Sequence, residues 1–199
     1  MIITISLIAR SYSQNIIKQV SNLHYPEKKW VLTHILVAPK ANKISDLAKK
    51  YANEAINDPD FDGDYSGGQI DAYRHTIWMA MLTQEINAKK AYKLGVAHEK
   101  GNEIDFRKKI LEEERLPDSV SCEMDLKNND VGIEIGKTNL KASHDELKVI
   151  VKQAVLSGKC YKIKKDENRN FLDTQGNIIP AKDWLGKWIN PKVLVSSDY

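Results

Sequence analysis

Residues 69–82 read QIDAYRHTIWMAML, and the expected fold is built around this segment. Its apolar side chains recur three and four residues apart, at Ile70, Tyr73, Ile77, Met81 and Leu82. This period is typical of an α-helix, and we expect the helix to run from about Gln69 to Asn87. Residues 57–68 are dense in aspartate and glycine, so they predict a long loop that leads into this helix.

Helical spacing recurs on both sides of the central segment. A capping box, Ser143 to Glu146, opens the last of these helices, and Gly158 is expected to end it. The prolines at 26 and 39 interrupt the pattern near the N-terminus. The other expected helices cover residues 12–24, 30–37, 41–56, 89–100 and 122–138.

Two segments have a different character. The charged residues 101–119 predict a solvated helix or excursion that ends at Pro117. After residue 158, short β-prone stretches alternate with turn formers, as in residues 160–173, and predict a small hairpin or meander. We therefore expect a mainly α helical bundle, residues 1–158, with a short C-terminal β appendage, residues 159–199.

The composition narrows the class of protein. The 199 residues carry 30 basic and 27 acidic side chains, a net charge of +3, so nothing in the charge indicates a nucleic-acid partner. The longest apolar stretch, residues 1–9, is far shorter than the roughly 20 residues of a transmembrane segment, and none is expected. Cys122 and Cys160 form no Cys-x-x-Cys motif, and a disulfide between them would require export.

Residues 71–78 carry the first candidate site. On a helix, the i,i+4 step places Asp71 and His75 on one face, where the carboxylate can orient the imidazole, and Trp78 extends that face. Arg74 can contact an anionic group or pair with Asp71 as a structural ion pair. The alternative is that Asp71 complements the helix dipole and His75 is a core histidine with its hydrogen bonds satisfied.

Two further segments carry polar residues on expected helices. His98 shares a stripe with small residues, and Glu99 lies about 100° around the helix from it. In the third segment, one helix face aligns Asp125, Asn128, Asn129, Gly132 and Gly136. The glycines of that face permit close helix packing, whereas the alternative is a turn at residues 128–130.

Together these segments predict a site at which several helices meet. Bundles build metal centres from histidine and carboxylate side chains on facing helices, and the expected ligands are His75, His98, Glu99 and Asp125. This nitrogen and oxygen set suits a divalent metal such as zinc. Without a metal, the same side chains form acid/base pairs for hydrolysis.

Three motifs in order resemble a bacterial family. They are the Gly-rich entry to Asp-Ala-Tyr-Arg-His-x-x-Trp at residues 67–78, Ala-His-Glu at 97–99, and Met-Asp-Leu-x-Asn-Asn-x-Val-Gly at 124–132. The resemblance covers about residues 28–138. Members occur as C-terminal modules of Rhs-type polymorphic toxins and as exported proteins. The resemblance implies a toxin or effector that is secreted or delivered to the periplasm of a target cell, with a cognate immunity protein as partner.

The sequence thus leads to two functional hypotheses. The first is a toxin-type hydrolase acting on a cell-envelope polymer or lipid, with His75, His98, Glu99 and Asp125 at the reacting centre. Asp71, Arg74, Trp78, Asn128 and Asn129 would then bind substrate or fix the geometry of that centre. The second is a non-catalytic binding protein in which these residues form a buried polar network. Access separates the two, because a reacting centre must open onto a cleft.

Overall fold

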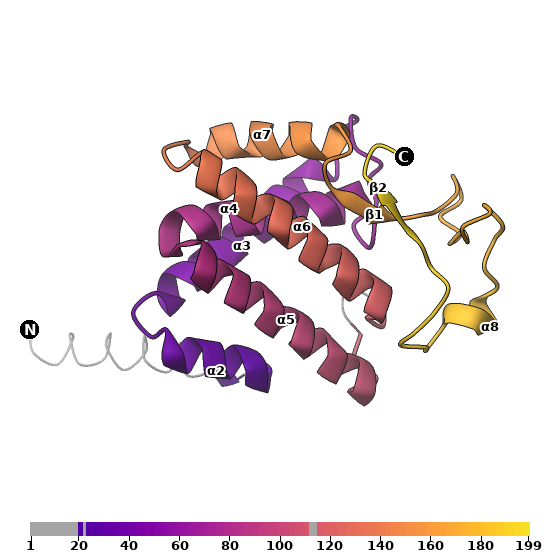
Figure 1. Cartoon of the computed structure of the whole chain (residues 1–199), viewed down its shortest axis with the longest axis horizontal. Coiled ribbons are helices and arrows are strands. Elements are labelled where there is room, and N and C mark those ends of the chain that lie inside the picture. Colours follow the sequence, from indigo (N-terminus) through magenta and orange to yellow (C-terminus); the bar gives the residue numbers. More distant parts are fainter. Residues whose placement is uncertain (1–19, 22, 112–114) are drawn as a thin grey trace, which may run out of the picture.

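The computed structural model describes residues 20, 21, 23–111 and 115–199. Helices dominate the chain, and a small two-stranded sheet lies near the C-terminus (Figure 1). The expectation of a mainly α bundle with a small β element is therefore confirmed. The described elements are α2 (Tyr25–Thr33), α3 (Ala38–Ala55), α4 (Gln69–Ile86), α5 (Ala88–Lys108), α6 (Ser119–Thr138), α7 (His144–Leu156), β1 (Tyr161–Ile163), α8 (Ala181–Trp184) and β2 (Leu194–Ser196).

Helix α4 is the centre of the bundle. It packs against α3, α5, α6 and α7, and every residue from Gln69 to Thr83 is buried. The predicted apolar stripe therefore understates the burial, because this helix is surrounded on all sides. As a consequence, its polar residues Asp71, Arg74 and His75 lie inside the protein.

Glycines on α6 allow this helix to approach α4 closely. A Cβ on Gly132 would meet the Thr76 carbonyl oxygen well inside contact distance, and one on Gly136 would lie 2.6 Å from the Ala80 carbonyl oxygen. The predicted role of these glycines in close packing is confirmed, and α6 runs unbroken through residues 128–130. The close approach brings the polar face of α6 against α4.

The ends of several helices differ from the sequence-based predictions. Helix α2 begins at Tyr25 rather than Trp30, because Pro26 occupies its first turn, where no amide donor is needed, and Glu27 caps the His24 backbone. Helix α5 continues to Lys108, so the first half of the segment predicted as a solvated helix or excursion, 101–119, is helical, but it is partly buried, at Gly101, Asn102 and Asp105. The helix expected over 12–24 falls largely on residues outside the described part of the chain.

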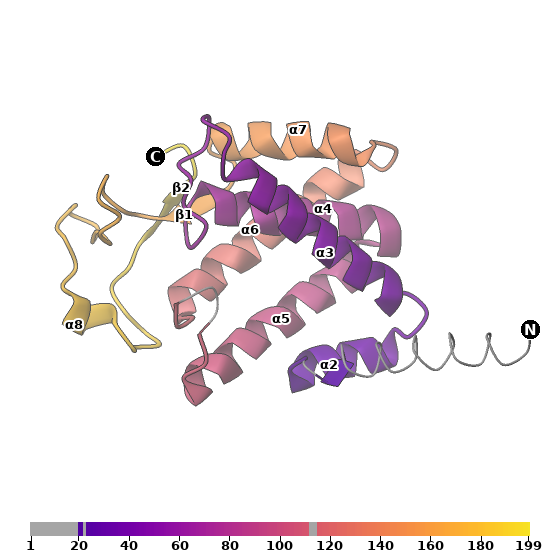
Figure 2. The same ribbon diagram turned by 180° about the vertical axis from the view of Figure 1, so that it is seen from behind.

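The two strands of the C-terminal segment are far apart in sequence but pair with each other. Strand β1 pairs antiparallel with β2, with Tyr161 opposite Ser196, whereas residues 165–178 form only isolated bridges. Between the strands the chain makes an excursion that includes α8 and projects from the bundle (Figures 1 and 2). Its buried Phe171 and Ile179 pack with Met124 of α6 in a second small core. The excursion is thus anchored to the end of α6.

Other sequence-based expectations concern thiols, membrane spans and surface polarity. Cys122 and Cys160 are both buried, and the two described cysteines form no disulfide. Among the described residues, no helix combines the length and the apolar character needed to cross a bilayer.

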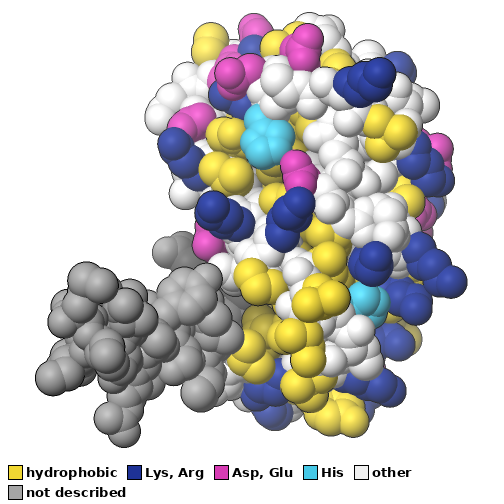
Figure 3. Space-filling model, turned by 90° about the vertical axis from the view of Figure 1, so that its left-hand side faces the viewer, with side chains coloured by type: hydrophobic (Ala, Val, Ile, Leu, Met, Phe, Trp, Pro, Cys, Tyr) yellow, Lys and Arg dark blue, Asp and Glu magenta, His cyan; other side chains and the backbone are white. Residues whose placement is uncertain are grey.

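Hydrophobic side chains gather over part of the end face seen in Figure 3. Leu32 and Leu36, near the α2–α3 connection, are 67% and 96% exposed, so the core does not bury all of the apolar content.

Candidate metal centre

The loop before α4 fixes the first member of the centre, Asp71. Gly67 adopts a φ of 83°, a conformation that side chains disfavour, and its amide donates to Asp71 Oδ2 at 2.7 Å. Asp71 Oδ1 accepts from the Arg74 guanidinium at 2.5 Å, one helical turn away. Asp71 is therefore held in place through both carboxylate oxygens, which explains why a Gly-rich segment precedes it.

His75 lies between α4 and α6 and is fully buried. Its Nε2 is 3.4 Å from Asp125 Oδ1 and 3.7 Å from Asp71 Oδ1. On the other side of the ring, Nδ1 lies 3.2 Å from Asn129 Oδ1. With the amide in this orientation, Nδ1 carries the proton and donates it to Asn129, so Nε2 presents a lone pair to the two carboxylates.

The surroundings of His75 keep its ring neutral. Burial lowers the pKa of His75 well below its usual value, and the positive charges of Arg74 and His98 lower it further, whereas the hydrogen bond to Asn129 opposes the shift. A neutral imidazole is the form that binds metals. Among the described residues, Nε2 has no hydrogen-bond partner, although it is buried between two acids. A cation between this lone pair and the carboxylate oxygens would compensate all three buried groups.

The spacing of these atoms suits a metal ion. One ligand atom from each of Asp71, His75 and Asp125 lies within 4.8 Å of the others. Two ligands that are each about 2.1 Å from zinc in a tetrahedral site are about 3.4 Å apart, and the two distances from His75 Nε2 are close to this value. Asn129 would then orient the ligating histidine from behind.

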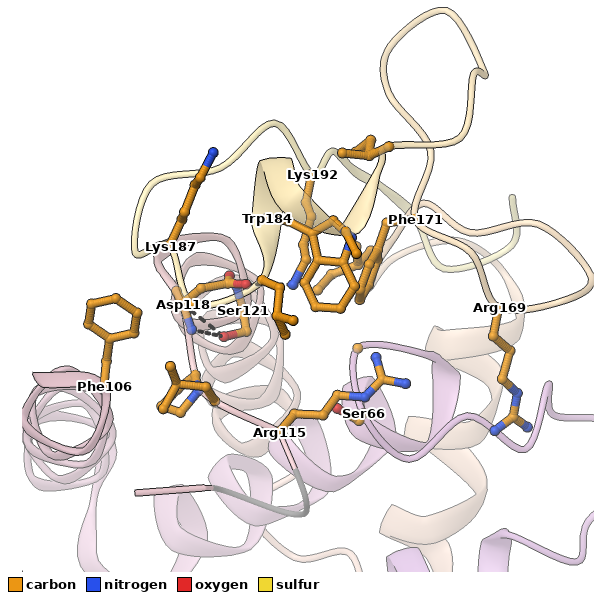
Figure 4. Close-up of a pocket in the computed structure, with 18 of the residues that line it drawn as sticks. Ser66, Phe106, Arg115, Asp118, Ser121, Arg169, Phe171, Trp184, Lys187 and Lys192 are labelled. Atoms are coloured by element: carbon orange, nitrogen blue, oxygen red, sulfur yellow. Dashed lines mark hydrogen bonds and ion pairs between the residues drawn. The ribbon is translucent and has the colours of Figure 1, made fainter. Parts of the chain in front are cut away.

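The centre borders a cavity on one side. A cavity of about 670 Å³ is lined by Asp71, Arg74 and Asp125, whereas His75 lies behind them. The cavity lies between the helical bundle and the C-terminal excursion, and Figure 4 shows Ser66 and Arg115 facing Phe171 and Trp184 across it. Both acids of the centre therefore border the cavity, although Asp125 Oδ1 and His75 Nε2 are themselves buried.

His98 lies beside this centre and pairs with a different acid. Its ring centroid is 6.3 Å from that of His75 and 5.5 Å from that of Trp78. Its Nδ1 is 3.2 Å from Glu27 Oε1, and the pair lines a separate, smaller cavity of about 200 Å³. Trp78 lines the same cavity and donates to Ser45 through Nε1 at 2.9 Å. No sequence pattern indicated Glu27 as the partner of His98, because the two residues are 71 positions apart in the chain.

Glu99 bonds within its own helix, whereas Asn128 joins α6 to β1. Glu99 is buried and accepts from Asn102 Nδ2 at 3.0 Å, one turn further along α5. The Asn128 amide binds β1 twice, donating to the Tyr161 carbonyl at 2.9 Å and accepting from the Tyr161 amide at 2.8 Å. Of the four expected metal ligands, the structure brings His75 and Asp125 into the three-residue group together with Asp71, and His98 and Glu99 are not members of it.

The comparisons with known proteins give one match. A family described as a domain of unknown function, DUF6973, matches residues 28–159. No curated protein and no solved structure matches the chain. The matched region contains all three members of the candidate metal centre, whereas most of the C-terminal excursion lies beyond it.

Proposed function

The chain belongs to the DUF6973 family, and we propose that it is a hydrolase whose reaction is assisted by a divalent metal held by Asp71, His75 and Asp125. The observation that carries the proposal is the buried Nε2 of His75, which faces two carboxylates without a hydrogen bond. The nitrogen and oxygen donors favour zinc or another divalent ion of similar preference.

The arrangement suits catalysis better than a sealed structural site. Structural zinc sites are closed by four protein ligands, whereas catalytic sites leave a position for water. Three protein ligands are grouped here, and the two acids line the cavity. A metal in this position would lower the pKa of a bound water and supply hydroxide as the nucleophile.

Each neighbouring side chain has a role in this proposal. A carboxylate offers about four lone-pair sites, so Asp71 Oδ1 can accept from Arg74 and still bind a metal. Asn129 fixes the tautomer of His75, and the Gly67 amide fixes Asp71. His98 is not a member of the three-residue group, so we place it as a positioning residue packed against Trp78 and His75.

The resemblance to polymorphic-toxin modules directs the search for a substrate. We propose a cell-envelope polymer or lipid, cleaved after secretion or delivery to a target cell, and a cognate immunity protein that blocks the cavity. The producing cell would escape damage if the bond that the toxin cleaves is absent from the compartment in which the toxin is made, or is protected there.

The test combines a phenotype with a matched set of variants. The full chain is directed to the periplasm of a test bacterium, and growth is compared for wild type, Asp125→Asn, and His144→Ala, a histidine on α7 outside the centre. We expect wild type and His144→Ala to inhibit growth and Asp125→Asn to be harmless at equal expression. Inhibition by Asp125→Asn equal to that of wild type would refute the proposal.

A further inference from the structure

The wall of the 670 Å³ cavity opposite the metal centre is basic. The lining of the whole cavity includes six cationic side chains and three acids, Asp71, Asp118 and Asp125. Two of the acids already have cationic partners, because Asp71 pairs with Arg74 and Asp118 pairs with Lys192 at 2.6 Å. The other cations of the lining are Lys109, Arg115, Arg169 and Lys187.

These remaining cations have weak partners. Arg115 lies over the Phe171 ring at 5.6 Å, Lys109 lies over the Phe106 ring at 4.6 Å, and Arg169 donates to the Gly63 carbonyl at 3.3 Å. Within the described part of the chain, none of these three forms an ion pair with a carboxylate. In the described part of the chain their charges line the cavity, and a metal at the centre would add to them.

One part of the wall is apolar. Phe171 and Trp184 meet edge to face, with ring centroids 4.8 Å apart, and Lys192 lies over both rings. Figure 4 shows Arg115 extending beneath these rings toward Ser66, with Arg169 on the far side of the cavity. A ligand can therefore place an anionic group among the cations while an apolar group contacts the aromatic rings.

We propose that this cavity binds a phosphate ester, and that the C-terminal excursion, residues 164–193, supplies much of the surface that recognises it. Guanidinium groups match phosphate oxygens in geometry and charge, and the phosphate carries more oxygen acceptors than a carboxylate. The inference rests on the proposed hydrolase and names its substrate class. Hydrolysis would form a bond from water oxygen to phosphorus and break the phosphorus–oxygen ester bond, and the proton from water would pass to the leaving alcohol.

The excursion lies almost wholly outside the region matched by the family, residues 28–159, whereas the metal centre lies inside it. Much of the proposed recognition surface therefore lies outside the matched region, whereas Lys109 and Arg115 lie inside it with the metal centre. Arg169, Phe171, Trp184 and Lys192 all come from this excursion.

Binding is tested first, with inorganic pyrophosphate as the probe and the full chain in calorimetric titrations. We expect Arg115→Gln and Arg169→Gln each to raise the Kd about tenfold, or about 1.4 kcal/mol, since each removes a charge-assisted hydrogen bond to a phosphate oxygen. Lys182→Gln is the matched control, because Lys182 is an exposed cation of α8 that does not line the cavity. We expect it to change the Kd less than twofold.

Three results would overturn the phosphate assignment. These are no pyrophosphate binding by wild type at millimolar concentration, an equal loss of affinity in Lys182→Gln, and tighter binding of citrate than of pyrophosphate. Asp125→Asn separates this inference from the proposed function, because it removes a metal ligand but no cation of the wall. If Asp125→Asn still binds pyrophosphate, the binding site is supported independently of the metal. If wild type also hydrolyses no phosphate ester, the hydrolase is refuted while the binding site stands.

Hydrolysis is then measured on two phosphodiester sources. One arm uses vesicles of phosphatidylglycerol, and the other uses soluble bis(p-nitrophenyl) phosphate. Turnover in either arm that falls at least tenfold in Arg115→Gln, and less than twofold in Lys182→Gln, would support the inference, and the faster arm would identify the source of the phosphate. Turnover that is equal in wild type and Arg115→Gln would overturn it.

Discussion

Replacing Gly132 with alanine tests how the close contact of α4 and α6 supports the centre. The added Cβ would lie 2.8 Å from Met79 Cβ and still closer to the Thr76 carbonyl oxygen, which belongs to the helix backbone. Carbon atoms pack at about 3.5–4.0 Å, so the helices must separate by roughly 1 Å. Overpacking of this severity costs about 3 kcal/mol, and the better helix propensity of alanine returns about 1 kcal/mol.

We therefore expect Gly132→Ala to lower the free energy of unfolding by about 2 kcal/mol, which corresponds to a fall in Tm of about 4–8 °C for a chain of this size. Asp125 and Asn129 lie on the same face of α6, so separation of the helices should also weaken metal binding by at least tenfold. Urea unfolding and metal titration measure the two effects. Asp130→Ala, on the exposed face of α6, is the control and should change the stability by less than about 0.5 kcal/mol. A Gly132→Ala variant as stable as wild type would refute the reasoning.

Three further predictions concern the surroundings of the centre. Burial raises the pKa of Cys160 to about 11, and Cys122 is buried as well, so the native protein should react slowly with a thiol reagent at pH 8, and two thiols per chain should react after unfolding in urea. Glu99→Ala leaves the buried Asn102 amide without its acceptor, so it should lower the free energy of unfolding by about 1–3 kcal/mol while the stoichiometry of metal binding is unchanged. Burial alone would raise the pKa of Glu27, but the hydrogen bond and charge of His98 outweigh it and hold the pKa below 4.5. The folded state thus binds this proton more weakly than the unfolded state, so stability should fall as the pH drops below about 4.5, and Glu27→Gln should lose less over that range.

Much of the fold follows from local sequence signals. The spacing of apolar residues located α4, α6 and α7, and the capping box marked the start of α7 at His144. The extension of α5 was not predictable from polarity, because its buried Asp105 is compensated by His24, which is 2.9 Å away and 81 residues earlier in the chain. The pairing of β1 with β2 was missed for a similar reason, since local turn formers favoured a nearer partner.

The candidate site was predicted in part. The i,i+4 step identified Asp71 and His75 as neighbours, and helical spacing placed Asp125 and Asn129 on one face. His98 and Glu99 are adjacent in sequence, but they lie about 100° apart on α5 and point to different partners, Glu27 and Asn102. The basic wall could not be predicted, because a long excursion brings Arg169 and Lys192 back to the bundle only in three dimensions.

The central claim is that Asp71, His75 and Asp125 bind one divalent metal ion. The most direct measurement is calorimetric titration of zinc into the chelator-treated full chain, with Asp125→Asn compared in parallel and the folded state of both checked by circular dichroism. The account predicts one zinc ion per wild-type chain and at least a hundredfold weaker binding by Asp125→Asn, because asparagine keeps the size of the side chain and removes its charge. An absence of stoichiometric zinc binding by the folded wild-type chain, or equal binding by the variant, would contradict it.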